Sequence, residues 1–299
     1  MIYLLRSFLM VSALLCTVQI SASSDVSHIP RTEIVSLQAK DGGKYDLIVS
    51  LPNNYGAHPN VKYPTLYYLD GHWDATVLTS IYELMRLDNL VPDLILVGLS
   101  YPDAPSDWPR RRMTDYTPTK DSALSGSGGG DKFLKFLSQQ VIPMIEEDYK
   151  SDPKQRAIAG HSLGGLFALY TMFEQPMLFK RVMALSPSAL TGPDYLLNAE
   201  KRFYSKGNTL ETRLFFSYGV AEPQVYVNPI LEFEDQFSTR DYVGLTYKFK
   251  ALSTVKHVTS KLDGYVTGLP WLYRDLAPEG ETGFASFINK AYKDSQIIK

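Results

Sequence analysis

The sequence predicts an α/β fold in which helices cover both faces of a mostly parallel β-sheet. Strand-like and helix-like runs alternate along the chain, and this alternation is typical of sheets built from β-α-β units. Two short apolar runs, residues 65–69 and 94–99, are continuous in the manner of strands buried on both faces. No segment of the sequence repeats at a fixed period, which argues against a solenoid architecture.

The expected strands are short runs rich in apolar, β-branched and aromatic residues. In chain order we predict them at residues 35–37, 45–51, 65–69, 94–99, 156–159, 182–185, 214–218 and 245–251. Helical patterns separate most of these runs, so we expect most of the strands to lie parallel.

The expected helices carry apolar residues at helical spacing. One helix covers residues 74–88 and has on one face Val77, Ile81 and Leu84. A longer helix covers residues 132–149, where we expect a kink at Pro143. Its inward-facing residues are Leu134, Leu137 and Val141. Another helix begins at Leu163, and two more close the chain.

The composition is that of an ordinary soluble globular protein. Hydrophobic residues make up 44% and charged residues 21% of the 299 residues. The formal net charge of −2 gives no basis for a nucleic-acid partner, because nucleic acids favour a basic surface. No linker divides the chain after its N-terminal segment, so we expect a single catalytic domain over residues 24–299.

Residues 1–23 have the order of a cleaved secretory signal. Arg6 precedes an apolar run over residues 8–20, and small residues follow at 21–24. This run is shorter than the roughly 20 residues that a membrane-spanning helix needs. We therefore expect a secreted or periplasmic protein with no stable membrane anchor. Cys16 is the only cysteine and would leave with the signal, which excludes cysteine nucleophiles, disulfides and thiolate metal sites.

Residues 160–164 read Gly-His-Ser-Leu-Gly and match the G-x-S-x-G pattern of a nucleophile turn. An apolar strand leads into Gly160, and a helical run follows Gly164. In the α/β-hydrolase fold the serine stands on a sharp strand-to-helix turn, where glycines two residues before and after it leave room for the backbone. The next helix points its N-terminus at the developing oxyanion. The motif therefore predicts the α/β-hydrolase fold with Ser162 as the nucleophile.

The general base follows by elimination, because this fold fixes the chain order nucleophile, acid, histidine. Of the five histidines, only His257 follows Ser162 with room for an acid between them. His161 is expected to point away from the serine and pack. The acid should follow the strand at 214–218, and the first carboxylate there is Glu222. The alternatives lie further on, at Glu232, Glu234 and Asp235.

Two backbone amides are expected to bind the oxyanion. One is the N–H of Leu163, the residue after the nucleophile. The other is the N–H of His72, in the loop after the third strand. Gly71 in that loop would let the backbone approach the substrate closely.

The connection at residues 101–130 is long for a βα loop, and loops of this length are often functional. Its aromatic and cationic residues are Tyr101, Trp108, Tyr116 and the run Arg110-Arg111-Arg112. Rings beside arginines suit a planar, electron-rich or anionic acyl group, such as a catechol or hydroxycinnamoyl ester. We therefore expect Arg112 and Trp73 to contact the substrate. Alternatively, Arg112 pairs with Asp115 and pins the loop.

The chain resembles the group of α/β-hydrolases that includes enterochelin (siderophore) esterases, S-formylglutathione hydrolases and feruloyl esterases. The resemblance spans roughly residues 44–273 and rests on residues 69–73, 112–118, 160–167, 186–188, His257 and 268–272. The enterochelin-esterase branch is most similar, because of Leu-Asp-Gly-x-Trp and Asp-Tyr-Thr-Pro.

The resemblance implies the same nucleophile and base, Ser162 and His257, and the same oxyanion donors, His72 and Leu163. One departure concerns the acid. Glu222 stands where many relatives have an aspartate, and some members of the enterochelin branch manage with a Ser–His pair. The importance of the acid is therefore open.

These features predict a serine esterase that cleaves a small-molecule ester through an acyl-enzyme intermediate. The histidines are scattered without metal-ligand spacing, and we expect no metal and no organic cofactor. Two alternatives use the same fold: an acyltransferase, in which an alcohol replaces water, and a non-catalytic binding protein.

Overall fold

The computed structural model describes residues 29, 31–102, 107–122, 124–188, 195–280 and 283–297. Within them, eight strands form one sheet in the order β1-β2-β4-β3-β5-β6-β7-β8. The strands are β1 (Thr32–Gln38), β2 (Lys44–Ser50), β3 (Tyr63–Tyr68), β4 (Ile95–Ser100), β5 (Ser151–His161), β6 (Arg181–Leu185), β7 (Arg213–Gly219) and β8 (Thr246–Leu252). β2 is antiparallel to β1 and β4, and all other neighbours are parallel, which confirms the mostly parallel α/β-hydrolase sheet.

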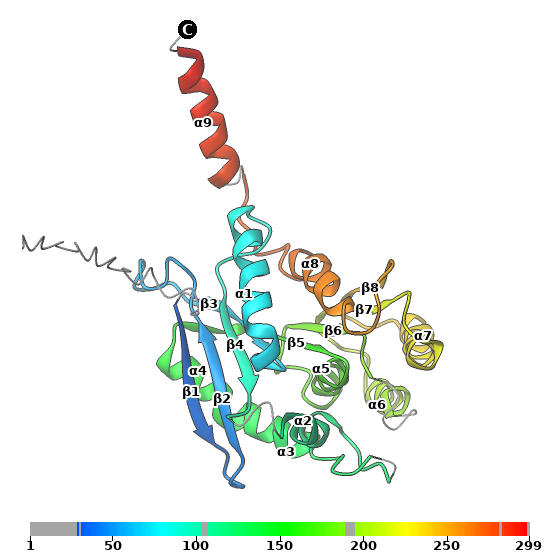
Figure 1. Ribbon diagram of the computed structural model, residues 1–299. Helices are drawn as coiled ribbons and strands as arrows, with labels where there is room; N and C mark the ends of the chain where they lie inside the picture. Colours follow the sequence, from blue (N-terminus) through cyan, green and yellow to red (C-terminus); the bar gives the residue numbers. More distant parts are fainter. Residues whose placement is uncertain are drawn as a thin grey trace, which may run out of the picture.

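Helices cover both faces of this sheet, as expected (Figure 1). The α-helices of the described residues are α1 (Gly71–Leu87), α2 (Trp108–Tyr116), α3 (Gly130–Phe136), α4 (Ile142–Asp148), α5 (Leu163–Glu174), α6 (Tyr195–Tyr204), α7 (Gln224–Ser238), α8 (Ser260–Leu272) and α9 (Gly283–Ile297). α1 and α8 pack on one face, and α4 and α5 pack on the other. Figure 1 shows α9 extending away from the sheet.

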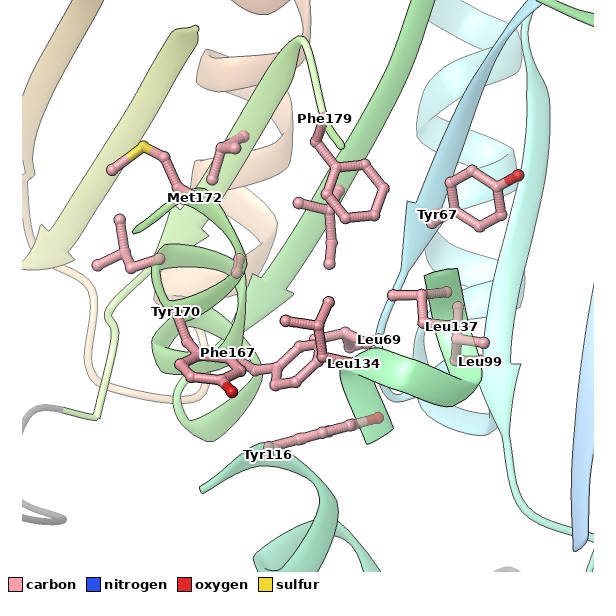
Figure 2. Close-up of a cluster of buried hydrophobic side chains, with 14 of the residues drawn as sticks. Tyr67, Leu69, Leu99, Tyr116, Leu134, Leu137, Phe167, Tyr170, Met172 and Phe179 are labelled. Atoms are coloured by element: carbon pink, nitrogen blue, oxygen red, sulfur yellow. The ribbon is translucent and has the colours of Figure 1, made fainter. Parts of the chain in front are cut away.

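The central strands are buried on both sides, and β3 illustrates this best. Successive side chains of a strand point to opposite faces, so Tyr67 and Tyr68 enter two different hydrophobic clusters. Figure 2 shows the Tyr67 cluster, which includes Phe167 of α5 and Leu134 of α3. Both tyrosines have no exposed surface. A sheet packed on both faces leaves the carboxyl ends of its parallel strands as the edge available for a site.

α1 packs through a face that its apolar pattern does not reveal. The helix begins at Gly71 rather than at residue 74. Of the three apolar residues on the predicted face, Ile81 is partly buried and packs against the core, whereas Val77 and Leu84 are 37% and 67% exposed. The buried face instead carries Asp74, Ala75, Leu78, Tyr82 and Met85. A buried carboxylate needs partners, and those of Asp74 lie far along the chain, where helical spacing cannot show them.

The long helix is confirmed, and a π-helical turn precedes its proline, where a kink was expected. α3 and α4 are joined by a π-helical turn, Leu137–Val141, so that one helical stretch runs from Gly130 to Asp148. Pro143 follows this turn in the first turn of α4. Proline has no N–H to donate to the residue four positions before it, and the π turn changes the hydrogen-bonding register where that bond would fall. Three residues predicted to face inward are buried: Leu134, Leu137 and Val141.

The expected signal at residues 1–23 lies outside the described residues. In the part of the chain that the structure describes, no helix combines the length and apolar character needed to cross a membrane.

Candidate active site

Ser162 occupies a strained turn between β5 and α5. Its dihedral angles are φ 59° and ψ −119°, a region that non-glycine residues adopt only when the surrounding structure holds them there. A Cβ atom on Gly160 would lie 2.3 Å from the main-chain carbon and oxygen of Gly164, so the turn requires glycine there. A Cβ on Gly164 would come no closer than 3.3 Å, to the side chain of Leu69. The requirement for glycine is therefore stricter at position 160 than at position 164.

Three side chains from separate loops meet at this turn. Nε2 of His257 lies 2.9 Å from Oγ of Ser162, and Nδ1 of His257 lies 2.7 Å from Oε2 of Glu222. Ser162 follows β5, Glu222 follows β7, and His257 lies between β8 and α8. The structure therefore brings together the three residues expected from chain order. The alternative carboxylates lie within α7: Glu232, Glu234 and Asp235.

Glu222 is held as a carboxylate by the groups around it. It is only 4% exposed. Its Oε1 atom accepts hydrogen bonds from the N–H of Gly219 at 2.6 Å and from the hydroxyl of Ser186 at 2.5 Å. Burial raises the pKa of Glu222, but the hydrogen bonds from His257, Ser186 and Gly219 together outweigh it, so the pKa lies below its ordinary value. A buried anion in this position can orient and stabilise an imidazolium.

Both expected oxyanion donors lie in the first turn of a helix. His72 is the second residue of α1, and Leu163 is the first residue of α5. The first four N–H groups of an α-helix have no acceptor within the helix, and the helix dipole makes this end partly positive. β3 and β5 are neighbours, and the N–H of Leu69 donates to the carbonyl of Ala159 at 3.0 Å. This pairing places the start of α1 at the same sheet edge as the nucleophile turn.

Gly71 has a packing role that the sequence interpretation did not include. A Cβ atom there would lie 2.9 Å from the main-chain carbon of Gly98 in β4. Asp70, just before it, adopts a left-handed conformation with φ 58° and ψ 39°. The close approach of α1 to β4 therefore requires glycine at this position.

The guanidinium of Arg112 forms its hydrogen bonds with groups of the protein itself. Its Nε and Nη2 atoms each donate a 2.9 Å hydrogen bond to the carboxylate of Asp70, and Nη2 also donates to the carbonyl of His161 at 3.2 Å. The Arg112 side chain is 13% exposed, and that of Asp70 is 2% exposed. Asp115 accepts a 3.0 Å hydrogen bond from Tyr45 instead. The alternative pairing of Arg112 with Asp115 is therefore wrong in its partner: the guanidinium binds Asp70 and the carbonyl of His161.

The other two arginines of the run also have partners within the chain. Arg110 donates two hydrogen bonds to Asp107. Arg111 donates to the carbonyl of Lys44 and lies over the rings of Tyr45 and Tyr101. The run therefore binds α2 to its surroundings.

Trp73 follows His72 in the first turn of α1 and is an exposed aromatic residue. It is 56% exposed, and its ring centroid lies 4.3 Å from that of Trp108. Nζ of Lys261 lies 5.5 Å from the Trp73 centroid and 2.6 Å from Oδ1 of Asp74. Two indole rings and a fixed ammonium group therefore stand beside the loop of the expected oxyanion donor.

Sequence reasoning assigned no role to Ser186 or Ser260. Ser186 follows β6 directly, has φ 39°, and bonds Glu222. Ser260 begins α8, and its hydroxyl lies 2.8 Å from that of Ser186. The sequence did contain a signal for Ser186: it is a polar residue that directly follows a buried strand, at the sheet edge where the site forms.

Comparison with known proteins places the chain in one family. The family model described as "Putative esterase" matches residues 39–243. The chain is similar to the ferri-bacillibactin esterase BesA of Bacillus subtilis, with 29% identity over 67% of this chain and 74% of that protein. It is also similar to a siderophore enterobactin esterase of Emericella nidulans, with 30% identity over 68% of this chain and 74% of that protein.

Solved structures agree on the fold. The BES protein from Bacillus cereus superposes with a TM-score of 0.74 at 24% identity, over 82% of this chain and 95% of that one. The siderophore hydrolase EstB from Aspergillus nidulans superposes with a TM-score of 0.73 at 25% identity, over 85% of this chain and 99% of that one.

Proposed function

Because the chain belongs to the "Putative esterase" family and is a carboxylic ester hydrolase, we propose that it works through Ser162, His257 and Glu222. The main support for this proposal is a chain of two short contacts. Oγ of Ser162 lies 2.9 Å from Nε2 of His257, and Nδ1 of His257 lies 2.7 Å from Oε2 of Glu222. The N–H groups of His72 and Leu163 are the proposed oxyanion donors.

In the first half-reaction, Nε2 of His257 takes the proton of Ser162 as Oγ attacks the ester carbonyl carbon. The carbonyl oxygen becomes an oxyanion held by the two amides. Collapse of this intermediate breaks the bond to the alcohol oxygen, which leaves with the proton from His257. Glu222 stays ionised throughout and stabilises the imidazolium.

The second half-reaction uses the same groups on the acyl-enzyme. His257 removes a proton from water, and the resulting hydroxide attacks the acyl carbon. The bond to Oγ then breaks, Ser162 recovers its proton from His257, and the carboxylic acid leaves. Each chemical step needs only these side chains, two amides and water.

For the substrate, we propose aryl-acyl or siderophore-type esters. Relatives named as esterases of ferri-bacillibactin, enterobactin and triacetylfusarinine C support the siderophore-type class. The indole rings of Trp73 and Trp108, whose centroids lie 4.3 Å apart beside His72, offer an aromatic surface that supports the aryl class. Aromatic side chains bind planar rings by stacking.

A substrate panel tests this assignment. Hydrolysis of enterobactin and its ferric complex is compared with that of p-nitrophenyl acetate and butyrate, with Ser162→Ala as the blank. We expect a higher kcat/KM for the siderophore esters. A preference for the short aliphatic esters would overturn the substrate class and leave a general carboxylesterase. Product analysis with added alcohol measures any acyl transfer.

We also propose that residues 1–23 are a secretory signal and that residues 24–299 form the catalytic domain of a secreted or periplasmic protein. The order of charged, apolar and small residues supports this. N-terminal sequencing of protein made in its own cell should begin between about residues 23 and 26. An intact Met1 on cytoplasmic protein would contradict it.

A further inference from the structure

The imidazole of His161 is a buried titratable group that the proposed mechanism does not use. The residue is 6% exposed and directly precedes Ser162. Its Nε2 atom lies 2.6 Å from the main-chain carbonyl oxygen of His257, and the two imidazole centroids are 4.8 Å apart. The His161 ring thus contacts both the main chain and the imidazole of the residue proposed as the base.

The direction of this hydrogen bond follows from chemistry. Burial lowers the pKa of His161 well below its ordinary value, and the charge of Lys261 lowers it further. The ring is therefore neutral and carries a single proton. A carbonyl oxygen can only accept, so that proton is on Nε2 and is donated to His257.

The same carbonyl lies at the end of a buried polar chain. The hydroxyl of Ser260 lies 2.7 Å from the carbonyl oxygen of His257 and 2.8 Å from the hydroxyl of Ser186. Ser186 in turn donates to Glu222. Ser260 and Ser186 are 0% and 1% exposed. The backbone of His257 is thus tied both to the nucleophile turn and to the loop that carries the acid.

The main chain of His161 makes a third connection. Its carbonyl accepts a hydrogen bond from Arg112, which pairs with Asp70 at the start of the oxyanion loop. His161 therefore contacts the main chain of the proposed base directly, and it is linked through Arg112 to Asp70, which precedes the helix that carries the proposed oxyanion donor. It is joined to the nucleophile by a peptide bond.

We propose that His161 is a positioning residue, whose Nε2–H holds the main-chain carbonyl of His257 and so sets the distance from the base to Ser162. This rests on the proposed roles of Ser162 and His257. A misplacement of about 1 Å in a catalytic group can lower a rate by about 100-fold. The proposed role therefore acts on kcat, while KM, which reflects the substrate contacts of other residues, stays nearly constant.

A matched pair of variants separates the hydrogen bond from packing. In His161→Gln the amide nitrogen can reach the place of Nε2 and keeps a donor, whereas His161→Met has similar length and no donor. We expect His161→Met to lose about 10- to 100-fold in kcat with KM within threefold. His161→Gln should recover most of that loss. The exposed residue His58 gives the control variant, His58→Met, with wild-type kinetics.

Thermal unfolding and the rate of labelling by a fluorophosphonate are measured on each variant, so that kcat is compared only among folded proteins. Equal losses in the Gln and Met variants would show that His161 only fills space, and would overturn the proposal. So would wild-type kcat in His161→Met. If His161→Met does not fold, His161→Leu takes its place as the variant without a donor, and a kcat equal to that of His161→Gln would overturn the proposal. Full activity in Ser162→Ala would identify failure of the proposed function itself.

Discussion

Arg112 and Asp70 form a bidentate pair in which both N–H···O distances are 2.9 Å. Asp70 directly precedes α1, whose second residue is the proposed oxyanion donor His72. Arg112 lies in α2, within the long connection after β4. The same guanidinium bonds the carbonyl of His161 beside the nucleophile. The pair therefore joins the two segments whose amides are the proposed oxyanion donors.

Substitution of Arg112 tests this positioning role. Arg112→Gln leaves Asp70 buried without its partner, and breaking a buried ion pair in this way costs about 3–5 kcal/mol of stability. We expect a lower melting temperature and an equal proportional loss of kcat/KM for aryl and butyryl esters. Only a substrate contact changes the ratio between two substrates, so a loss confined to the aryl ester would restore Arg112 as a substrate-binding residue.

Glu222→Gln measures the importance of the acid. The amide can still contact the imidazole, but it favours the wrong tautomer and cannot stabilise the imidazolium. We expect a fall in kcat on the order of 10⁴-fold, smaller than the fall in Ser162→Ala. Glu234→Gln, in α7, is the matched control and should be unchanged. Wild-type activity in Glu222→Gln, together with an inactive Glu234 or Asp235 variant, would move the acid to α7.

Trp73 is the better candidate for substrate preference, because its indole is exposed while Arg112 is occupied. An aromatic contact contributes about 0.5–1.5 kcal/mol. Trp73→Ala should therefore lower kcat/KM for aryl esters by about 3- to 10-fold and leave acetyl and butyryl esters nearly unchanged. Trp73→Phe keeps a ring and should retain most of the preference. An unchanged aryl-to-butyryl ratio in Trp73→Ala would exclude this contact.

Asp115 gives a prediction about stability and pH. Burial raises the pKa of Asp115 to about 6, although the hydrogen bond from Tyr45 acts in the opposite direction. An unfolded aspartate titrates near about 3.9, so between about pH 4 and 6 the native state binds more protons, and its free energy of unfolding falls as pH rises. Asp115→Asn removes this dependence.

Urea unfolding at several pH values measures this effect. Relative to wild type, Asp115→Asn should gain up to about 3 kcal/mol of stability between pH 4 and pH 7. Asp131→Asn, at an exposed position on α3, serves as the control and should leave the slope unchanged. Parallel wild-type and Asp115→Asn curves would mean that Asp115 ionises normally in the native protein.

The fold and the proposed triad follow from local signals that sequence carries well. Continuous apolar runs predicted the parallel strands, and the glycines around Ser162 predicted its turn. Chain order then singled out His257 and Glu222, and the structure brings these residues together.

The missed features depend on contacts between distant segments. Arg112 bonds Asp70 across 42 residues, and His161 bonds the carbonyl of His257 across 96 residues. The second contact involves a main-chain atom, which has no sequence signature. The buried face of α1 includes Asp74, whose partners Lys261 and Tyr265 lie on α8. From helical spacing alone, a charged residue such as Asp74 is predicted to face the solvent.

The most direct test of the central claim is intact-mass and peptide analysis after treatment with a fluorophosphonate, which labels only an activated serine. The account predicts one adduct per chain, on Ser162. It also predicts no adduct in a folded Ser162→Ala variant, whose kcat/KM for esters should fall by about 10⁴-fold or more. An adduct on a different serine, or near wild-type ester hydrolysis by folded Ser162→Ala, would contradict the assignment of Ser162 as the nucleophile.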